Sequence, residues 1–226
     1  MFYKVVGRLI PYDYYRDDFP EVFPNDFIID IETTGLDPNE DIIVCLGIAD
    51  LWHLSITIYF LEDPSKWQEF HKFCRKKVFE LLNSGDVWAY NSLFESKFLK
   101  IPRFSTTFSS TRGIQYGIFD LMCGTGFYRL KQAAMLINYK YKLNVDELIK
   151  DVDIDGKDVP KVYLKDWCVK RDEKAKWRII DHNHRDLIRG YLVRYHVKKV
   201  ALKIRDQLPK FAPEPHIIFD WLRPLY

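Results

Sequence analysis

The chain has 226 residues, a length that fits one globular domain with decorations. Its 34 basic and 32 acidic residues nearly cancel, so no overall basic field indicates a nucleic-acid partner, and the balance does not exclude one. The sequence has no cationic and apolar leader, no apolar run near the ~20 residues of a membrane span, and no C-x-x-C spacing. We therefore expect an intracellular (cytoplasmic), soluble protein without a structural zinc site.

The first third of the chain predicts an arm and then a sheet. Residues 1–25 combine aromatics and prolines without a helical period, so we expect an N-terminal arm, either extended or a short hairpin. Apolar runs joined by short links predict three antiparallel strands at 27–31, 42–49 and 54–61. Apolar residues at steps of three and four predict an amphipathic helix over 64–82.

The remaining chain alternates between strands and helices. Apolar runs predict short strands at 87–90 and 115–121, and periodic patterns predict helices at 93–100, 129–138, 144–150 and 183–207. The charged segment 151–178 predicts an insertion with little regular structure, and the Pro- and aromatic-rich residues 209–226 predict a tail. This order predicts an α/β fold over 26–208, in which three antiparallel strands are followed by parallel strands in one mixed sheet flanked by helices.

The most informative segment is Asp30-Ile31-Glu32-Thr33-Thr34-Gly35-Leu36. Residues two apart in a strand face the same side, so Asp30 and Glu32 project together from an otherwise apolar strand. Two buried carboxylates repel each other, and a divalent cation removes that repulsion. Because no His or Cys spacing accompanies the acids, the pattern indicates a hard cation such as Mg²⁺ or Mn²⁺. The alternative is a pair of acids at a solvated strand end.

This segment resembles the first motif of the DEDD superfamily of 3′–5′ exonucleases, which includes polymerase proofreading domains on a ribonuclease H-like fold. The stretch Asn91-Ser92-Leu93-Phe94-Glu95 is similar to the second motif, N-x-x-F-D, with Glu95 where aspartate is usual. His182 and Asp186 resemble the third motif, which has the forms Y-x-x-x-D and H-x-x-x-x-D. This chain has a histidine at the tyrosine spacing.

A further stretch is similar to a signature of predicted ribonuclease H-like exonucleases. Phe119-Asp120-Leu121 is followed by Tyr128-Arg129-Leu130-Lys131. Lys131 either contacts a phosphate or supports the fold. We expect Asp120 to support the site rather than to bind a metal.

The resemblance implies a two-metal-ion nuclease that uses Mg²⁺ or Mn²⁺ and hydrolyses phosphodiester bonds of DNA or RNA from single-stranded ends. It implies that Asp30 bridges the two ions, that Glu32 and Asp186 hold the ion that activates water, and that Glu95 contacts the site directly or through water. His182 is then a general base, a group that orients water, or neither. A nucleic-acid-binding module with weak catalysis and a structure-specific endonuclease are the alternatives on the same fold.

The resemblance also implies residues that bind the substrate. Thr33, Thr34 and Leu36 follow the first strand and would hold the terminal nucleotide, with Leu36 against the last base; the alternative is an ordinary tight turn. Asn91 is a further candidate. The long helix carries a set of basic residues, several of them four apart, which form either a stripe along phosphates or a solvated face: Arg185, Arg189, Arg194, Lys198, Lys199 and Lys203. Arg185 lies nearest the predicted site and is the candidate for a phosphate contact.

Overall fold

The computed structural model describes residues 2–16, 19–104, 117–122, 128–150 and 154–207. These residues form a seven-stranded sheet in the order β1-β4-β3-β2-β5-β7-β6. The strands are β1 Phe2–Arg8, β2 Asp26–Thr33, β3 Ile43–Asp50, β4 Ser55–Leu61, β5 Asp86–Ala89, β6 Arg103–Phe104 and β7 Ile118–Asp120. The pairs from β1 to β2 are antiparallel, and β5, β7 and β6 continue the sheet in parallel. The predicted mixed sheet is confirmed.

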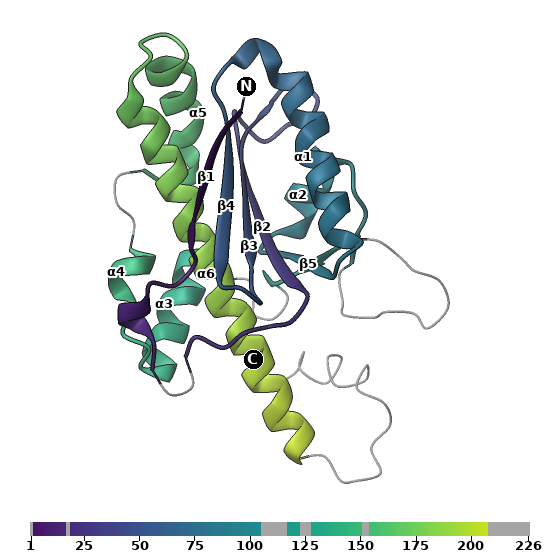
Figure 1. Cartoon of the computed structure of the whole chain (residues 1–226), viewed down its shortest axis with the longest axis vertical. Helices are drawn as coiled ribbons and strands as arrows, with labels where there is room; N and C mark the ends of the chain where they lie inside the picture. Colours follow the sequence, from purple (N-terminus) through teal and green to yellow (C-terminus); the bar gives the residue numbers. More distant parts are fainter. Residues whose placement is uncertain (1, 17–18, 105–116, 123–127, 151–153, 208–226) are drawn as a thin grey trace.

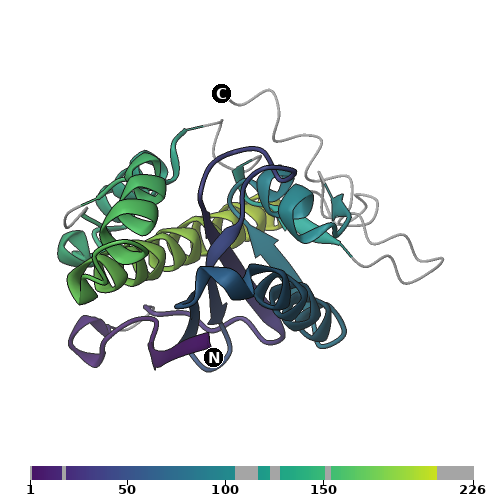
Figure 2. The same ribbon diagram turned by 90° about the horizontal axis from the view of Figure 1, so that it is seen from above.

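Helices cover both faces of the sheet (Figure 1). On one face, α1 (Trp67–Leu82) packs against β3 and β5, and α2 (Ser92–Leu99) lies beside it against β5 and β7. On the other face, the long helix α6 (Glu173–Gln207) crosses β2, β3 and β4. The helices α3 (Leu130–Tyr141) and α4 (Asp146–Ile149) pack on α6, as the view from above shows (Figure 2). The hydrophobic core therefore lies between the sheet and these two layers.

The predicted N-terminal arm contributes a strand. Residues Phe2–Arg8 pair with β4 as an edge strand, so the antiparallel part of the sheet has one strand more than the sequence predicted. The ring of Phe2 packs against Phe70 of α1, with the ring centroids 4.8 Å apart. After this strand, the chain forms a short 3₁₀ turn, η1 (Tyr12–Tyr14). The alternation of more and less buried residues along 2–8 has the period of a strand, although no turn residue marks the strand's start.

The prediction of an insertion with little regular structure is wrong for residues 154–178. They form the 3₁₀ turn η4 (Gly156–Asp158), α5 (Val159–Lys161), the π-helical turn η5 (Val162–Trp167) and the start of α6, which begins at Glu173 rather than near 183. Tyr163 and Trp167 are buried and donate hydrogen bonds to the carbonyl oxygens of Leu61 and Glu62, both at 3.0 Å. Because most of their neighbours are charged, the sequence did not indicate that Tyr163 and Trp167 are buried.

Two other predictions lie wholly or partly outside the described residues. The tail 209–226 is outside them, and of the predicted strand 115–121 residues 115 and 116 are outside them, while Ile118–Asp120 form β7. No helix in the described part of the chain is both long and apolar enough to cross a membrane.

Candidate metal centre

The carboxylates of β2 face helix α6. Asp30 and Glu32 lie two residues apart on the strand, and the side chain of Glu32 is buried. Asn183 of α6 is fully buried, and its Nδ2 donates to Asp30 Oδ2 at 2.7 Å and to the Asp30 carbonyl oxygen at 3.2 Å. This amide fixes the rotamer of Asp30 and ties the strand to the helix.

A glycine on the neighbouring strand makes room for this contact. Gly47 of β3 is the cross-strand partner of Asp30. A Cβ atom at Gly47 would lie 2.0 Å from Asn183 Oδ1 and 2.9 Å from a methyl carbon of Leu187, which are impossible separations. The absence of a side chain at this position therefore lets α6 approach the sheet closely enough for Asn183 to reach Asp30.

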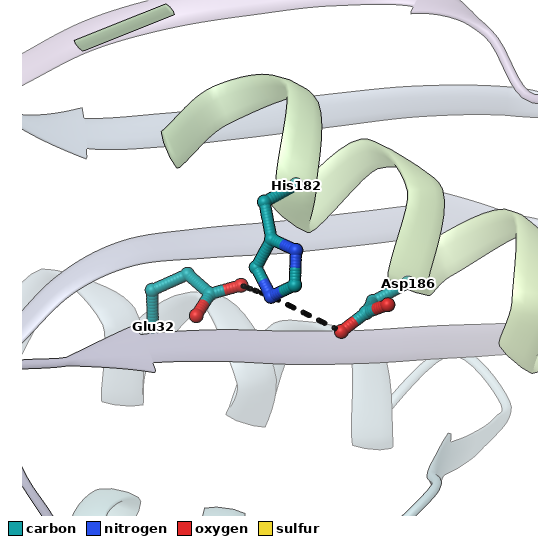
Figure 3. A group of neighbouring side chains, drawn as sticks. All are labelled: Glu32, His182 and Asp186. Carbon is teal, nitrogen blue, oxygen red and sulfur yellow. Dashed lines mark ion pairs between the residues drawn. The ribbon is translucent and has the colours of Figure 1, made fainter. Parts of the chain in front are cut away.

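Helix α6 supplies two further groups of the centre. His182 Nε2 lies 3.8 Å from Glu32 Oε1 and 3.6 Å from Asp186 Oδ2, between the two carboxylates (Figure 3). One ligand atom from each of Glu32, His182 and Asp186 lies within 4.8 Å of the others, a spacing that can hold a metal ion. This group joins one strand residue and two helix residues of the predicted site, and it includes His182, which was not among the predicted metal ligands.

Arg189 holds the last of these acids. Its Nη1 donates to Asp186 Oδ1 at 2.5 Å, and its Nε and Nη2 donate to the carbonyl oxygen of Ile149 at 2.9 and 2.7 Å. The Arg189 side chain is almost completely buried. This guanidinium leaves Asp186 Oδ2 facing His182 and fixes the orientation of the carboxylate.

Glu95 approaches the centre from the other layer. It lies on α2, is buried, and feels the negative charge of Asp30. The start of α2 is held by Ser92, whose Oγ donates to Asp120 Oδ2 at 2.9 Å, while the Met122 amide donates to Asp120 Oδ1 at 2.8 Å. Asp120 therefore supports the helix that carries Glu95, which is the supporting role that the sequence predicted.

The positive charge near the acids of the centre is too small to offset their burial and their mutual repulsion. Burial raises the pKa of Asp30, Glu32 and Glu95 well above ordinary values. The charge of Asp186 adds to the pKa rise at Asp30, and the charge of Asp30 adds to it at Glu32 and at Glu95. Removal from solvent and mutual repulsion thus act together against ionisation.

The buried oxygens fit a hard cation. Glu32 Oε1 and Glu95 Oε2 have no hydrogen-bond partner among the described residues. An unpaired buried carboxylate oxygen is unfavourable, and a divalent cation would supply the missing partner. The donor set is dominated by carboxylates, which suits Mg²⁺ or Mn²⁺. The residues present therefore fit a metal ion, with Asp30, Glu32, Glu95 and Asp186 as the candidate ligands.

The predicted substrate residues on the β2 turn are placed beside the acids. Thr33 is buried and its Oγ1 donates to the Gly35 carbonyl at 2.5 Å, whereas the Oγ1 of Thr34 donates to Asp41 Oδ1 at 3.1 Å. Leu36 is 83% exposed at the tip of this turn. A leucine held in solvent three residues from Thr33 is available for contact with a ligand.

The other predicted substrate residues differ in their surroundings. Asn91 is exposed at the start of α2, and Lys131 is half-buried in the first turn of α3. Arg185 donates from Nε to Asp181 Oδ2 at 3.0 Å and from Nη1 to the carbonyl oxygens of Glu147 and Lys150 at 2.8 and 3.2 Å. Arg185 therefore caps the end of α4, and its phosphate contact stays a prediction.

The other cations of α6 do not form an open stripe. Arg194 Nε donates to Asp26 Oδ2 at 2.9 Å, and Lys198 and Lys199 both pair with Glu21. With Arg189 buried against Asp186, most of the predicted stripe is used inside the fold. Neither alternative given for this stripe, a row of phosphate contacts or a solvated face, describes these paired cations.

The sequence did not indicate the supporting roles that Asn183 and Arg189 have at this centre. Asn183 lies four positions before Leu187 and eight before Tyr191, so it continues the buried stripe of α6 toward its start. A polar residue on that stripe is a signal that could have indicated a supporting role. Arg189 lies three residues after Asp186, where helical spacing places two side chains in contact.

The sheet order, the helical layers and the buried carboxylates define an α/β protein with a ribonuclease H-like fold. The sequence profile of the RNase H superfamily matches residues 27–197, and the chain belongs to that superfamily. An uncharacterized protein of Methanocaldococcus jannaschii is 29% identical over 168 residues, which cover 73% of this chain and 90% of that protein. Membership indicates nuclease-like activity on nucleic acid, and nucleases with this fold depend on metal ions.

Proposed function

We propose that the protein is a 3′–5′ exonuclease of the DEDD type, which hydrolyses phosphodiester bonds of DNA or RNA at single-stranded ends. The observation that carries the proposal is that acids from three elements lie close enough for their charges to interact: Asp30 and Glu32 from β2, Glu95 from α2 and Asp186 from α6. Two of these acids have buried oxygens without partners in the described structure. The order of these acids along the chain is the order of the DEDD motifs.

The four acids would hold two Mg²⁺ or Mn²⁺ ions, which stabilise negative charge on the attacking and leaving oxygens at phosphorus when bound. The chain's own groups prepare this reaction. Asn183 and Arg189 fix the carboxylates of Asp30 and Asp186 before substrate arrives. His182 Nε2, between Glu32 and Asp186, takes or orients the proton of the attacking water.

The turn after β2 supports a preference for strand ends. Thr33 and Thr34 are anchored by their own hydrogen bonds, and Leu36 stands in solvent beyond them. An exposed leucine beside the acids can pack against the last base of an unpaired terminus. In a continuing duplex, the base pairs would have to open before the leucine could reach that base.

The test is digestion of 5′-labelled single- and double-stranded DNA and RNA with Mg²⁺, Mn²⁺ or EDTA. We expect a ladder of fragments shortened from the 3′ end, with the single-stranded substrates degraded faster and no cleavage in EDTA. A 3′-blocked substrate provides the control. A single internal cut, or unchanged cleavage of the blocked substrate, would indicate an endonuclease. Binding without metal-dependent cleavage would indicate a binding module.

A further inference from the structure

A cavity of about 310 Å³ adjoins the metal centre along the first turns of α6. It is lined by Ile154, Lys174, Trp177, Arg178, Asp181, His182 and Arg185. All of these except Ile154 lie on α6 and recur at steps of three or four residues, so they form one continuous stripe of the helix. His182 belongs both to this stripe and to the metal centre.

The cavity extends from His182 toward the start of α6. With a rise of 1.5 Å per residue, Trp177 lies about 7.5 Å and Lys174 about 12 Å from His182 along the helix axis. The backbone of Gly156 forms part of the surroundings, because a Cβ atom there would lie 3.5 Å from His182 Nε2. The segment that follows residue 153 therefore packs against the metal centre and the cavity together.

The lining combines an aromatic ring with an excess of positive charge. Trp177 is held by an edge-to-face contact with Tyr3, at a centroid distance of 5.8 Å, and is still 46% exposed. Asp181 is the one acid among the described lining residues, and it pairs with Arg185 at 3.0 Å. Lys174 is exposed, and within the described part of the chain no carboxylate lies at ion-pair distance from its ammonium group.

We propose that this cavity binds one nucleotide unit of the substrate strand, with the base stacked on Trp177 and the phosphate at Lys174. A wholly apolar ligand would not need the cations, and an inorganic anion would not need the indole ring. Single-stranded nucleic acid presents both a π-face and a phosphate at every unit. The volume lies at the lower end of ligand pockets, which span roughly 300–1,000 Å³, so one unit is accommodated rather than several.

This inference rests on the proposed function, since the strand in the cavity is the strand cleaved at the metal centre. The binding experiment, however, does not need cleavage. Anisotropy of a fluorescein-labelled single-stranded oligonucleotide is measured in EDTA and again with Ca²⁺, for the wild type, Trp177→Leu and Trp177→Phe. Trp52→Leu is the matched control, because Trp52 is 49% exposed and lies in the turn between β3 and β4, away from the cavity.

We expect Trp177→Leu to weaken binding by roughly 5- to 150-fold, the range found when one base–aromatic stack is removed. Trp177→Phe should retain most of the affinity, and Trp52→Leu should bind like the wild type. Equal affinities for Trp177→Leu and the wild type, or no binding by the wild type in either buffer, would overturn the proposal.

A second variant tests the phosphate contact without touching the packing of Trp177. Lys174→Ala removes an exposed side chain, so folding should be unaffected. The negative slope of log K against log salt should become less steep by about 0.7, which corresponds to the loss of one single-strand phosphate contact. An unchanged slope would show that no phosphate sits at Lys174.

The nuclease assay separates the two proposals. If the protein cleaves from 3′ ends and Trp177→Leu raises KM with kcat kept, both hold. If no cleavage is found but Trp177→Leu still weakens binding, the exonuclease proposal fails and the subsite stands. If cleavage is found with KM and affinity unchanged in Trp177→Leu, the subsite fails and the exonuclease proposal stands.

Discussion

The variant Asp30→Asn should make the metal-free protein more stable while removing its response to Mg²⁺. Burial and the charge of Asp186 raise the pKa of Asp30 well above its ordinary value, so an ionised Asp30 opposes folding near neutral pH. Asparagine has the same shape, and its Oδ1 can still accept the 2.7 Å hydrogen bond from Asn183. The variant therefore removes the charge without removing the contact.

The sign of the pH dependence follows from the raised pKa. The contribution of Asp30 to stability is fully present below its unfolded-state pKa and is lost as pH rises through its folded-state pKa. The advantage of Asp30→Asn should therefore be small near pH 4 and largest near pH 8. Relief of one poorly compensated buried charge is worth about 1–3 kcal/mol. In a chain of this size that corresponds to a rise in Tm of roughly 2–12 °C.

Mg²⁺ should raise the stability of the wild type more than that of Asp30→Asn. At 100 times its dissociation constant, a ligand of the folded state alone adds about 2.7 kcal/mol, which is about 5–11 °C in Tm for the wild type. Asp30→Asn should show much less of this rise. Melting curves in EDTA and in Mg²⁺ at pH 4, 5 and 8 measure both effects, with Glu69→Gln as an exposed-acid control. A wild type more stable than Asp30→Asn at pH 8 in EDTA, or equal Mg²⁺ shifts, would refute the reasoning.

Four further predictions concern the residues around this acid. Glu95→Asp should keep measurable nuclease activity while Glu95→Ala loses most of it, and equal activity would show that the buried Glu95 carboxylate takes no part. Gly47→Ala should lower stability by about 1–3 kcal/mol and reduce activity, because its Cβ would meet α6 at 2.0 Å. Gly7→Ala, whose Cβ would meet Ile56 at an ordinary 3.6 Å, is the control in the same melting series. His182→Ala should lower kcat by about 10²–10⁴-fold with the Tm response to Mg²⁺ largely kept, and a full kcat would assign it a structural role. Leu36→Ala should leave Tm unchanged, since Leu36 is 83% exposed, and should raise KM for single-stranded ends; an unchanged KM would remove Leu36 from the substrate site.

The fold and most of the acids could be predicted because their signals are local. Asp30 and Glu32 follow the two-residue period of a strand, and His182 and Asp186 follow the four-residue spacing of a helix. Each pair therefore lies within one element and can be recognised from a few consecutive residues. The partners of Arg189 could not be read in this way, because the Ile149 carbonyl lies 40 positions away.

The early start of α6 was missed for a related reason. Most residues of its first turns are charged. The buried face is marked only by a few apolar residues, among them Ala175 and Ile179. The cavity beside His182 depends on those turns, so the sequence reading that treated 151–178 as an irregular insertion could not have located it.

The hydrogen bond between Asn183 and Asp30 joins residues 153 positions apart. During synthesis, the centre can therefore form only after the ribosome has added the residues of α6. Synthesis at about 5–20 residues per second places α6 roughly 8–30 s behind β2. During that interval the nascent chain carries Asp30 and Glu32 without His182, Asn183 or Asp186. A chain released before α6 is made carries Asp30, Glu32 and Glu95 but lacks Asp186, so the four candidate ligands come together only after α6 is synthesised.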